Sequence, residues 1–452
     1  MPKRHFSLLS KLPLAAEERA LLSTGLSSMV VRLLGMAASF VMGVLLARWL
    51  SPAGFGTYGI IVALALVLSV LAQFGLPTVA TRQVSVALAQ KRWSALRGYV
   101  WAFASIVAAS SVALAILWAG ITVSLPVLTG SVAANLVGSF LVPLFALTVL
   151  VSAELRALDR VVLGQSLEVV LRPALMCALL LLISIIGAQL TAPIAVGLNV
   201  IASAVTLAAG LIWLRSSIPD PARHCVAEPP RDWFRPAAAL AAVDVLKQLD
   251  VTYGMLLLGA LSSETQAGYF RVALSTIIFV STPLSIFNVV LAPALARLFA
   301  QGERGRLQRI LTLSALAMFA TTIAALMVIF FAGQPLIRLV FGASYEAAWL
   351  PLLLLTCAQA INGFFGVGWV LLSMSGGERR LTASFIVSVG VSVLAAIPLT
   401  AFAGAAGAGA AAIIGALIQN LLAWRGVHRH SSLESSAGGF LWQARAHDMP
   451  PD

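Results

Sequence analysis

The stretch that decides the fold of this chain is residues 237–274, which read AAALAAVDVLKQLDVTYGMLLLGALSSETQAGYFRVAL. Its first part, about 25 residues, is apolar and long enough to span a bilayer as a helix. It nevertheless contains three charged residues, Asp244, Lys247 and Asp250, which recur every third position and therefore lie on one side of such a helix. A charge at membrane depth costs about 2.5 to 3.5 kcal/mol and normally faces a partner or a hydrated cavity. The stretch predicts a membrane helix that borders a polar interior.

Part of this stretch also occurs earlier in the chain. Shifting the sequence by 211 positions aligns six pairs of identical residues: Gly43 with Gly254, Leu45 with Leu256, Leu46 with Leu257, Leu50 with Leu261, Ser51 with Ser262 and Tyr58 with Tyr269. Each copy predicts a helix, a short turn and the start of a second helix. Two such copies are typical of a transporter with parallel internal repeats, the alternative being chance similarity between apolar segments.

The composition indicates an integral membrane protein. Hydrophobic residues make up 60% of the 452 residues, charged residues 10%, and the mean hydropathy is +0.97, whereas soluble domains contain about a quarter charged residues. The net charge of +12 is spread between hydrophobic runs, which excludes the clustered basic face of a nucleic-acid-binding protein. The three cysteines are far apart, so neither a disulfide framework nor a metal site is predicted, and no cofactor is expected.

Hydrophobic runs of membrane-spanning length fall into two sets. The first set comprises 24–47, 56–76, 98–123, 131–152, 169–187 and 193–214, and the second comprises 237–260, 267–293, 310–332, 347–373, 381–400 and 404–424. The predicted fold is an all-α polytopic membrane protein of about twelve helices in two six-helix bundles. Its predicted parts are an N-terminal cytoplasmic or interfacial segment (1–23), an N-terminal bundle (24–215), a cytoplasmic linker (216–236), a C-terminal bundle (237–424) and a polar, disordered cytoplasmic tail (425–452).

The distribution of basic residues predicts the orientation. With a cytoplasmic N-terminus, only Arg48 and Arg338 of the 29 lysines and arginines fall in outside segments, and Arg32, Lys247 and Arg271 fall within spans. All the others are counted with the cytoplasmic segments, including Arg172 at the cytoplasmic start of the run 169–187. This asymmetry places both termini in the cytoplasm.

Two arginines within predicted helices are candidate substrate-binding residues. Arg32 lies near the cytoplasmic end of the first helix and Arg271 near the outer end of the eighth. Either side chain can reach the headgroup region by extending along the helix. The alternative is that each faces the cavity and binds an anionic group such as a pyrophosphate.

The charges of the deciding stretch are candidates for ion coupling. Two carboxylates around Lys247 leave a net negative charge, which is unusual for packing alone. Asp244 and Asp250 are therefore predicted to bind and release H⁺ or Na⁺, and Lys247 to contribute a cavity cation. The alternative is a neutralised packing cluster.

Amide side chains in the second half are candidates for lining the cavity. Asn288, Gln359 and Asn362 lie in predicted spans, where each can instead form a hydrogen bond between helices. No arrangement of catalytic or metal-binding residues is found, so the sequence predicts a protein that is not an enzyme.

Three phrases resemble a known family: LLARWLSPAGFGTYGI at 45–60, QLDVTYGMLLLGALSSETQAGYFRVA at 248–273, and LIRLVFGASYEAAWLPLLLL at 336–355. They are similar to the polysaccharide transporter family of the multidrug/oligosaccharidyl-lipid/polysaccharide exporter superfamily. The similarity runs from about residue 20 to 425.

The resemblance implies a flippase of the bacterial inner membrane. Its expected substrate is an undecaprenyl-pyrophosphate-linked oligosaccharide for O-antigen, capsule or exopolysaccharide synthesis. Two bundles would open alternately around a cavity in which Arg32 and Arg271 hold the pyrophosphate. Expected partners are membrane lipids, H⁺ or Na⁺ and a polysaccharide polymerase, with no nucleic acid.

Two alternatives remain open. A cation-coupled multidrug exporter has the same scaffold. A membrane enzyme acting on lipid-linked glycans is less favoured, because the predicted outer segments contain only two acidic residues, Glu264 and Glu346.

Overall fold

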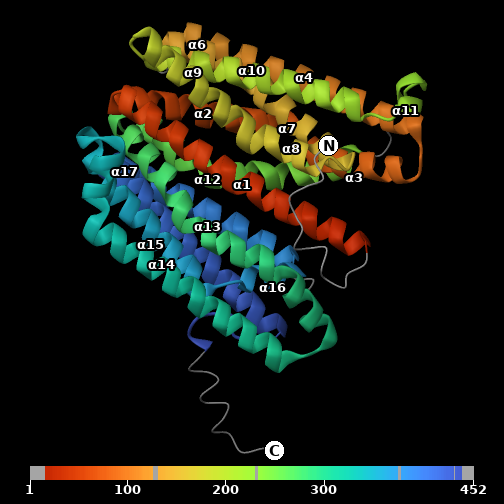
Figure 1. The fold of residues 1–452 in the computed structure, drawn as a ribbon. Helices are drawn as coiled ribbons and strands as arrows, with labels where there is room; N and C mark the ends of the chain where they lie inside the picture. The colour runs from red at the N-terminus through yellow and green to blue at the C-terminus, as the bar shows by residue number, and fades with distance from the viewer. Residues whose placement is uncertain (1–15, 126–130, 230–232, 375–377, 432, 440–452) are drawn as a thin grey trace, which may run out of the picture. The chain divides into compact units, whose positions relative to one another are not determined.

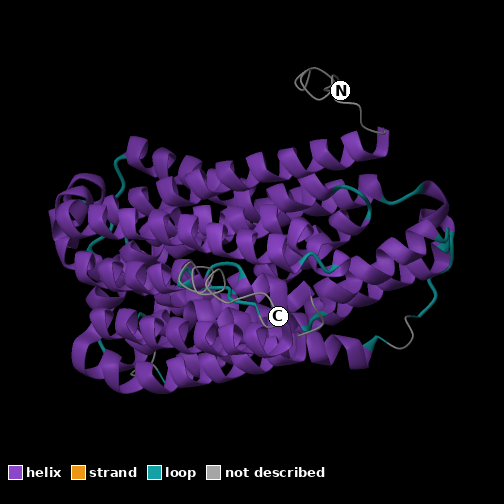
Figure 2. Ribbon diagram, turned by 90° about the horizontal axis from the view of Figure 1, so that it is seen from below, coloured by secondary structure: helices purple, strands orange, loops and turns teal. Residues whose placement is uncertain are grey.

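The computed structural model of the chain describes residues 16–125, 131–229, 233–374, 378–431 and 433–439. Within these ranges the secondary structure is helical and no strand is present (Figure 2). The chain divides into two compact units. The first contains Met1–Leu46 and Leu64–Val245, and the second contains Ala47–Ala63 and Leu246–Asp452. Both α1 and α2 therefore contribute residues to each unit.

Figure 1 labels most of the helices in chain order. Those before the central connection are α1 (Ala16–Trp49), α2 (Pro52–Gln73), α3 (Leu76–Ala89), α4 (Trp93–Ser124), α6 (Val132–Ser139), α7 (Leu141–Ala157), α8 (Val161–Ser166), the π-helical turn η2 (Leu167–Leu171), α9 (Arg172–Ile186), α10 (Ala192–Ser217) and α11 (Asp220–His224). Those after it are α12 (Phe234–Leu261), α13 (Glu264–Gln301), α14 (Arg304–Phe341), the 3₁₀ turn η3 (Ala343–Ala348), α15 (Trp349–Phe365), α16 (Gly368–Met374) and α17 (Glu378–Ser431).

Each predicted hydrophobic run coincides with helix, which confirms the all-α membrane fold. Ten helical segments of the described residues are long and apolar enough to cross a membrane. Helix α12 is not among them, since Asp244, Lys247 and Asp250 lie within it. Helix α17 counts as one segment although Gly404, the first residue of the last predicted run, has non-helical angles (φ 55°, ψ −129°). The number of crossings and the orientation of the termini stay predictions.

Helix α7 lies at the centre of the first unit, where it packs against α3, α4, α8 and α10. Its buried residues join two apolar clusters, one through Val151 and Leu155 and the other through Ala146 and Leu150. Other apolar side chains of this unit point outward, for example Ile185, which is 83% exposed. Outward-facing apolar side chains on helices of this length suit a lipid environment.

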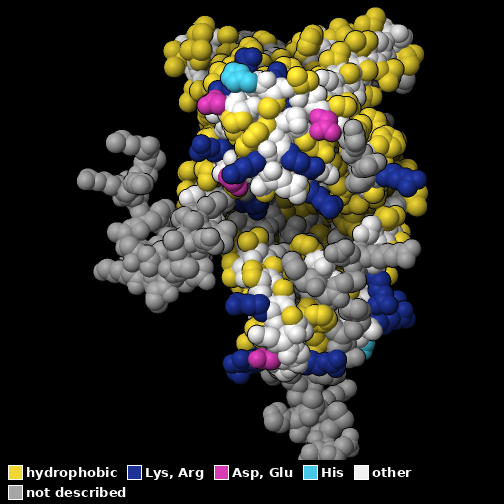
Figure 3. All heavy atoms as spheres, turned by 90° about the vertical axis from the view of Figure 1, so that its right-hand side faces the viewer, with side chains coloured by type: hydrophobic (Ala, Val, Ile, Leu, Met, Phe, Trp, Pro, Cys, Tyr) yellow, Lys and Arg dark blue, Asp and Glu magenta, His cyan; other side chains and the backbone are white. Residues whose placement is uncertain are grey.

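The predicted linker is packed against the start of α4. The Nη1 atom of Arg97 donates hydrogen bonds to the carbonyl oxygens of Arg223 (2.6 Å) and Cys225 (2.7 Å). The backbone N–H of Glu228 donates to the carbonyl of Ser94 at 3.1 Å. These contacts lie at the end of the first unit that contains α11 (Figure 1). Basic side chains gather on the face of the molecule that Figure 3 shows. Residues 223–228 of the linker thus pack against α4 within the first unit.

The second unit is built on the packing of α15 against α14 and α17. The prediction of a disordered tail is wrong for the described residues beyond 424. Helix α17 continues to Ser431, and residues 433–439 pack against α14 and α17. The side chain of Gln308 forms two hydrogen bonds with the backbone of Glu434, donating to its carbonyl (2.7 Å) and accepting from its N–H (2.8 Å). The Glu434 carboxylate also accepts from Trp424 Nε1 at 2.6 Å. Polar side chains on two helices therefore hold this polar segment in place.

Candidate functional site

Two glycines bring α2 and α13 into backbone contact inside the second unit. A Cβ atom added at Gly56 would lie 1.7 Å from the carbonyl oxygen of Glu264, and one added at Gly268 would lie 2.0 Å from that of Pro52. Glycine at both positions permits an approach that no other residue permits. Gly56 belongs to the first copy of the sequence repeat and Gly268 to the second. The two repeated segments therefore pack directly on each other.

Arg271 lies one turn beyond this contact on α13. Its side chain is half-buried, and its Cδ would be 3.3 Å from a Cβ placed on Gly59 of α2. The methyl of Met255 from α12 fills the same space, at 2.4 Å from that position. No acidic side chain pairs with Arg271 among the described residues. The structure thus holds a cation, without an acidic partner in the described part of the chain, where α2, α12 and α13 meet.

The three charges of α12 differ in surroundings. Asp244 and Asp250 are half-buried, whereas Lys247 is exposed. Asp244 belongs to the first unit, and Lys247 and Asp250 belong to the second. Lys247 and Asp250 form no ion pair with each other. The spacing predicted from the sequence is present, and the roles assigned to these three charges stay predictions.

Two of the predicted cavity-lining amides are joined in one chain of hydrogen bonds. Asn362 Nδ2 donates to Gln359 Oε1 at 3.2 Å, and Asn420 Nδ2 donates to Asn362 Oδ1 at 2.7 Å. Asn288 on α13 stands apart, and its buried Oδ1 has no hydrogen-bond partner among the described residues. Asn362 is therefore hydrogen-bonded between helices α15 and α17, Gln359 is joined to it within α15, and Asn288 keeps an unused acceptor.

Arg32 is exposed on α1 in the first unit. Three residues further along, Gly35 is buried against η2, because a Cβ there would lie 2.5 Å from the carbonyl oxygen of Val169. The close packing at Gly35 fixes α1 locally and leaves Arg32 outside the contact. Arg32 is available to a ligand or to a headgroup, and its role stays a prediction.

A buried carboxyl group in α7 was missed by the sequence analysis. Glu154 is 1% exposed, and neither carboxylate oxygen has a hydrogen-bond partner among the described residues. Burying such a group without a partner is costly. It lies just beyond the predicted run 131–152, and the sequence offers no second residue that would reveal its burial.

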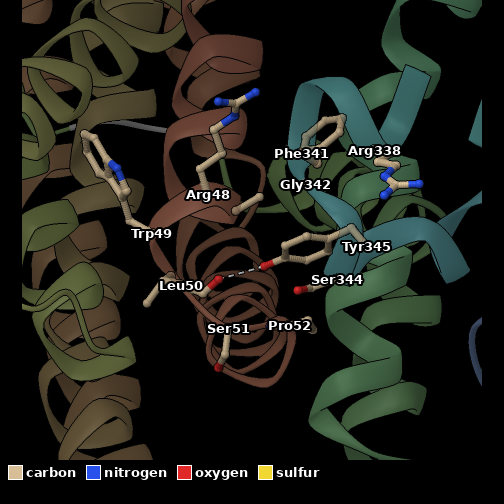
Figure 4. Close-up of a pocket in the computed structure, with 11 residues that line it drawn as sticks. Arg48, Trp49, Leu50, Ser51, Pro52, Arg338, Phe341, Gly342, Ser344 and Tyr345 are labelled. Carbon is tan, nitrogen blue, oxygen red and sulfur yellow. Dashed lines mark hydrogen bonds between the residues drawn. The ribbon is translucent and has the colours of Figure 1, made fainter. Parts of the chain in front are cut away.

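A polar pocket in the second unit was also missed (Figure 4). It is formed where α1 ends and where α14 gives way to η3, and its volume is about 640 Å³. Its lining residues are Ala47, Arg48, Trp49, Leu50, Ser51, Pro52, Arg338, Phe341, Gly342, Ser344 and Tyr345. The sequence did contain a signal for it, since Arg48 and Arg338 are the two basic residues predicted to be outside.

Residues 21–299 match the family described as polysaccharide biosynthesis protein. No curated protein sequence matches the chain.

Several solved structures share the fold. One is an inward-facing multidrug resistance transporter of the MATE family and the MOP superfamily (TM-score 0.71, 12% identity, covering 90% of this chain and 98% of that chain). A second is the lipid II flippase MurJ in an inward closed conformation (TM-score 0.65, 14% identity, 95% and 94%). A third is a MOP superfamily transporter from Pyrococcus furiosus (TM-score 0.60, 12% identity, 96% and 99%). At these identities the likeness establishes the fold alone, a multi-pass helical membrane fold that these transporters share.

Proposed function

Because this chain belongs to the polysaccharide biosynthesis protein family, we propose that it is a flippase of the bacterial inner membrane for undecaprenyl-pyrophosphate-linked oligosaccharide. The headgroup moves from the cytoplasmic to the periplasmic leaflet through a polar path while the lipid tail stays in the bilayer. The transported oligosaccharide is used in O-antigen, capsule or exopolysaccharide synthesis, in which a polymerase is the expected downstream partner. The shared fold with a flippase for lipid II supports this proposal.

The observation that carries the proposal is the state of Arg271. It is half-buried in a membrane helix and has no acidic partner among the described residues. A charge at such a depth is retained at a cost and normally faces a ligand or a hydrated path. A guanidinium matches the oxygens of a pyrophosphate with two parallel hydrogen bonds. Lys247, which lies in the same unit and has no ion pair among the described residues, supplies a further positive charge. Arg32, in the first unit, is proposed to bind phosphate at the cytoplasmic end of α1.

Polar contacts to the glycan are assigned to the amide side chains. The free Oδ1 of Asn288 is an acceptor for a sugar hydroxyl. Gln359 and Asn362 are already joined to each other and to Asn420. They contact the glycan by exchanging one of these hydrogen bonds for a sugar hydroxyl.

Ion coupling is assigned to Asp244 and Asp250. Asp250 is half-buried and forms no ion pair among the described residues, so it is available to H⁺ or Na⁺. For the ion to drive transport, it must bind one conformation of the protein more tightly than the other. No covalent step is involved, and the protein acts as a transporter rather than an enzyme.

A second candidate function is the export of cationic drugs. It is favoured by the likeness to MATE multidrug transporters, one of which has the highest TM-score among those described above, 0.71. In that case the carboxylates of α12 would contact the drug. The uncompensated positive charge of Arg271 argues against it, since a cationic drug would be repelled.

The first test is a strain that lacks this protein and any redundant flippase. We expect undecaprenyl-linked glycan to accumulate in the cytoplasmic leaflet and surface polysaccharide to be lost. The wild-type chain should restore both, Arg271→Lys should restore them partly, and Arg271→Ala should fail. Arg306→Ala is the matched control, because Arg306 forms an exposed ion pair with Glu303 at 3.0 Å. If the deletion strain has a normal leaflet distribution of undecaprenyl-linked glycan but altered dye efflux, the flippase proposal is rejected in favour of the drug exporter.

A further inference from the structure

The two outermost arginines of the predicted topology meet in one pocket. Arg48 and Arg338 are the only two of the 29 basic residues in segments predicted to be extracytoplasmic, and both line the pocket of about 640 Å³ described above. No aspartate or glutamate is among its lining residues. Pockets for small molecules measure about 300 to 1,000 Å³. Extracytoplasmic loops are poor in basic residues, so a general excess of positive charge does not account for this pairing.

Arg48 is fixed by the end of α14. Its Nε donates to the carbonyl of Val340 at 2.8 Å, and its Nη2 donates to that of Leu339 at 2.6 Å. These carbonyls belong to the last turn of α14, which has no intrahelical donors for them and carries the negative end of the helix dipole. The Nη1 group makes no hydrogen bond to any described residue. The guanidinium of Arg48 is therefore held in place by two hydrogen bonds, and its Nη1 group is available to donate to a ligand.

Arg338 is held only loosely. Its Nε lies 3.4 Å from Oε1 of Glu346, and the two side chains are 69% and 45% exposed. An exposed ion pair of this kind contributes little free energy, so an anion can compete for it. The two terminal nitrogens of Arg338 have no partner among the described residues. Figure 4 shows that Arg48 and Arg338 come from two different elements, α1 and α14.

The rest of the pocket is held by contacts within the protein. The buried Tyr345 hydroxyl donates to the carbonyl of Leu50 at 3.0 Å, which ties η3 to the turn between α1 and α2. Its ring packs edge-on against Phe55, with centroids 6.2 Å apart. The exposed Ser344 hydroxyl adds a polar group to the wall. A preformed pocket loses little conformational freedom on binding.

We propose that this pocket binds the diphosphate of the lipid-linked glycan once it has reached the periplasmic leaflet. Arg338 donates its terminal N–H groups to the phosphate oxygens, and Arg48 donates through Nη1. The buried Phe341 gives the pocket an apolar wall beside these cations. The site lies apart from Arg271 in the chain and rests on the proposed function for the identity of its ligand.

The test is protection of a cysteine placed in the pocket. Ser344→Cys is introduced into the full chain after the three native cysteines are replaced by serine, and the protein is reconstituted into vesicles. Labelling by a membrane-impermeant maleimide is measured with inorganic diphosphate, with inorganic phosphate, and with vesicles that contain undecaprenyl diphosphate or only phosphatidylglycerol. We expect diphosphate and undecaprenyl diphosphate to slow labelling about fivefold or more at saturation, and the other two additives to have little effect.

Two variants shift the diphosphate concentration needed for protection in opposite directions. Arg338→Gln should raise it about tenfold or more, since a charged hydrogen-bonded contact is lost. Glu346→Gln should lower it, because it removes the carboxylate that competes for Arg338. Arg306→Gln, on the same helix beyond the pocket, should leave it unchanged. Equal protection by phosphatidylglycerol, or no response to Arg338→Gln, would overturn the proposal.

The outcome can be separated from that of the proposed function. Arg271→Ala should abolish flipping in cells and leave protection of Ser344→Cys intact. Protection by diphosphate with a normal leaflet distribution in the deletion strain would retain the pocket and reject the flippase. If diphosphate fails to protect Ser344→Cys while the deletion strain accumulates glycan in the cytoplasmic leaflet, the flippase function is retained and the pocket is rejected as a diphosphate site.

Discussion

Replacing Gly56 by alanine tests whether α2 and α13 are held together by backbone contact. The added Cβ would lie 1.7 Å from the carbonyl oxygen of Glu264, and real Cβ atoms essentially never lie closer than 3.0 Å to such an atom. The helices must therefore separate locally by at least 1.3 Å, which is 3.0 minus 1.7 Å. Because the clashing atom belongs to a backbone carbonyl, no side-chain rotation can relieve it.

The expected cost is that of forcing extra volume into a packed interface, about 1 to 3 kcal/mol. Close packing at small residues contributes van der Waals attraction between membrane helices, so the separation also loses dispersion contacts. A loss of about 2 kcal/mol corresponds to roughly a 30-fold fall in the folding equilibrium constant. Alanine would by itself favour a helix over glycine by about 0.5 to 1 kcal/mol, which offsets part of the loss.

The assay is reversible unfolding of the purified protein in mixed micelles with an increasing fraction of denaturing detergent. Gly390→Ala is the matched control, because Gly390 also lies in a membrane helix and has nothing within 4 Å of its added Cβ. We expect Gly390→Ala to be neutral or slightly stabilising. Gly268→Ala should resemble Gly56→Ala, and the double variant should lose less than the sum, since one separation relieves both clashes. Equal stability of Gly56→Ala and Gly390→Ala would refute the reasoning.

Three further predictions follow from the described contacts. Glu154→Leu should stabilise the protein by about 1 to 3 kcal/mol in the same assay, because it removes a buried carboxyl without a partner; a loss of stability would reveal a partner absent from the structure. Glu434→Ala should release the docked segment 433–439, measured as faster amide hydrogen exchange there, and unchanged exchange would mean that Gln308 alone holds it. Tyr345→Phe should cost about 1 kcal/mol by removing the hydrogen bond to Leu50, and a neutral effect would show that the ring packing suffices.

Much of the fold could be predicted from the sequence, because membrane helices are specified by local composition. Hydrophobic runs of sufficient length predict helices wherever they occur, and the family resemblance from phrases such as 45–60 was confirmed by the match of residues 21–299. The packing of residues 433–439 could not be predicted. Their sequence is polar, and only the positions of Gln308 and Trp424 in the folded unit supply the hydrogen-bond partners that order them.

The candidate site was predictable in part for a related reason. The cost of a charge in a membrane singles out Arg32, Arg271 and the charges of α12 from the sequence alone. Which of them have partners depends on helices far apart in the chain. Counting charges likewise identified Arg48 and Arg338 as the two basic residues in predicted outer segments. The sequence could not show that Arg48 donates a hydrogen bond to the end of α14, or that both arginines line one pocket.

The division of the chain into units limits what the spacing of charges on α12 can mean. Asp244 and Asp250 lie six residues apart on one helix, and a period of three residues grouped them with Lys247 as a single site. The boundary between the units falls between Val245 and Leu246, so the two carboxylates pack with different sets of helices. Helical spacing determines the directions in which side chains project from one helix. The burial and the neighbouring charges of each carboxylate depend on the other helices that pack around it. Asp250 is half-buried within the second unit, which also contains Arg271. If Arg271 binds substrate as proposed, we therefore expect Asp250 rather than Asp244 to be the carboxylate whose ion occupancy responds to it.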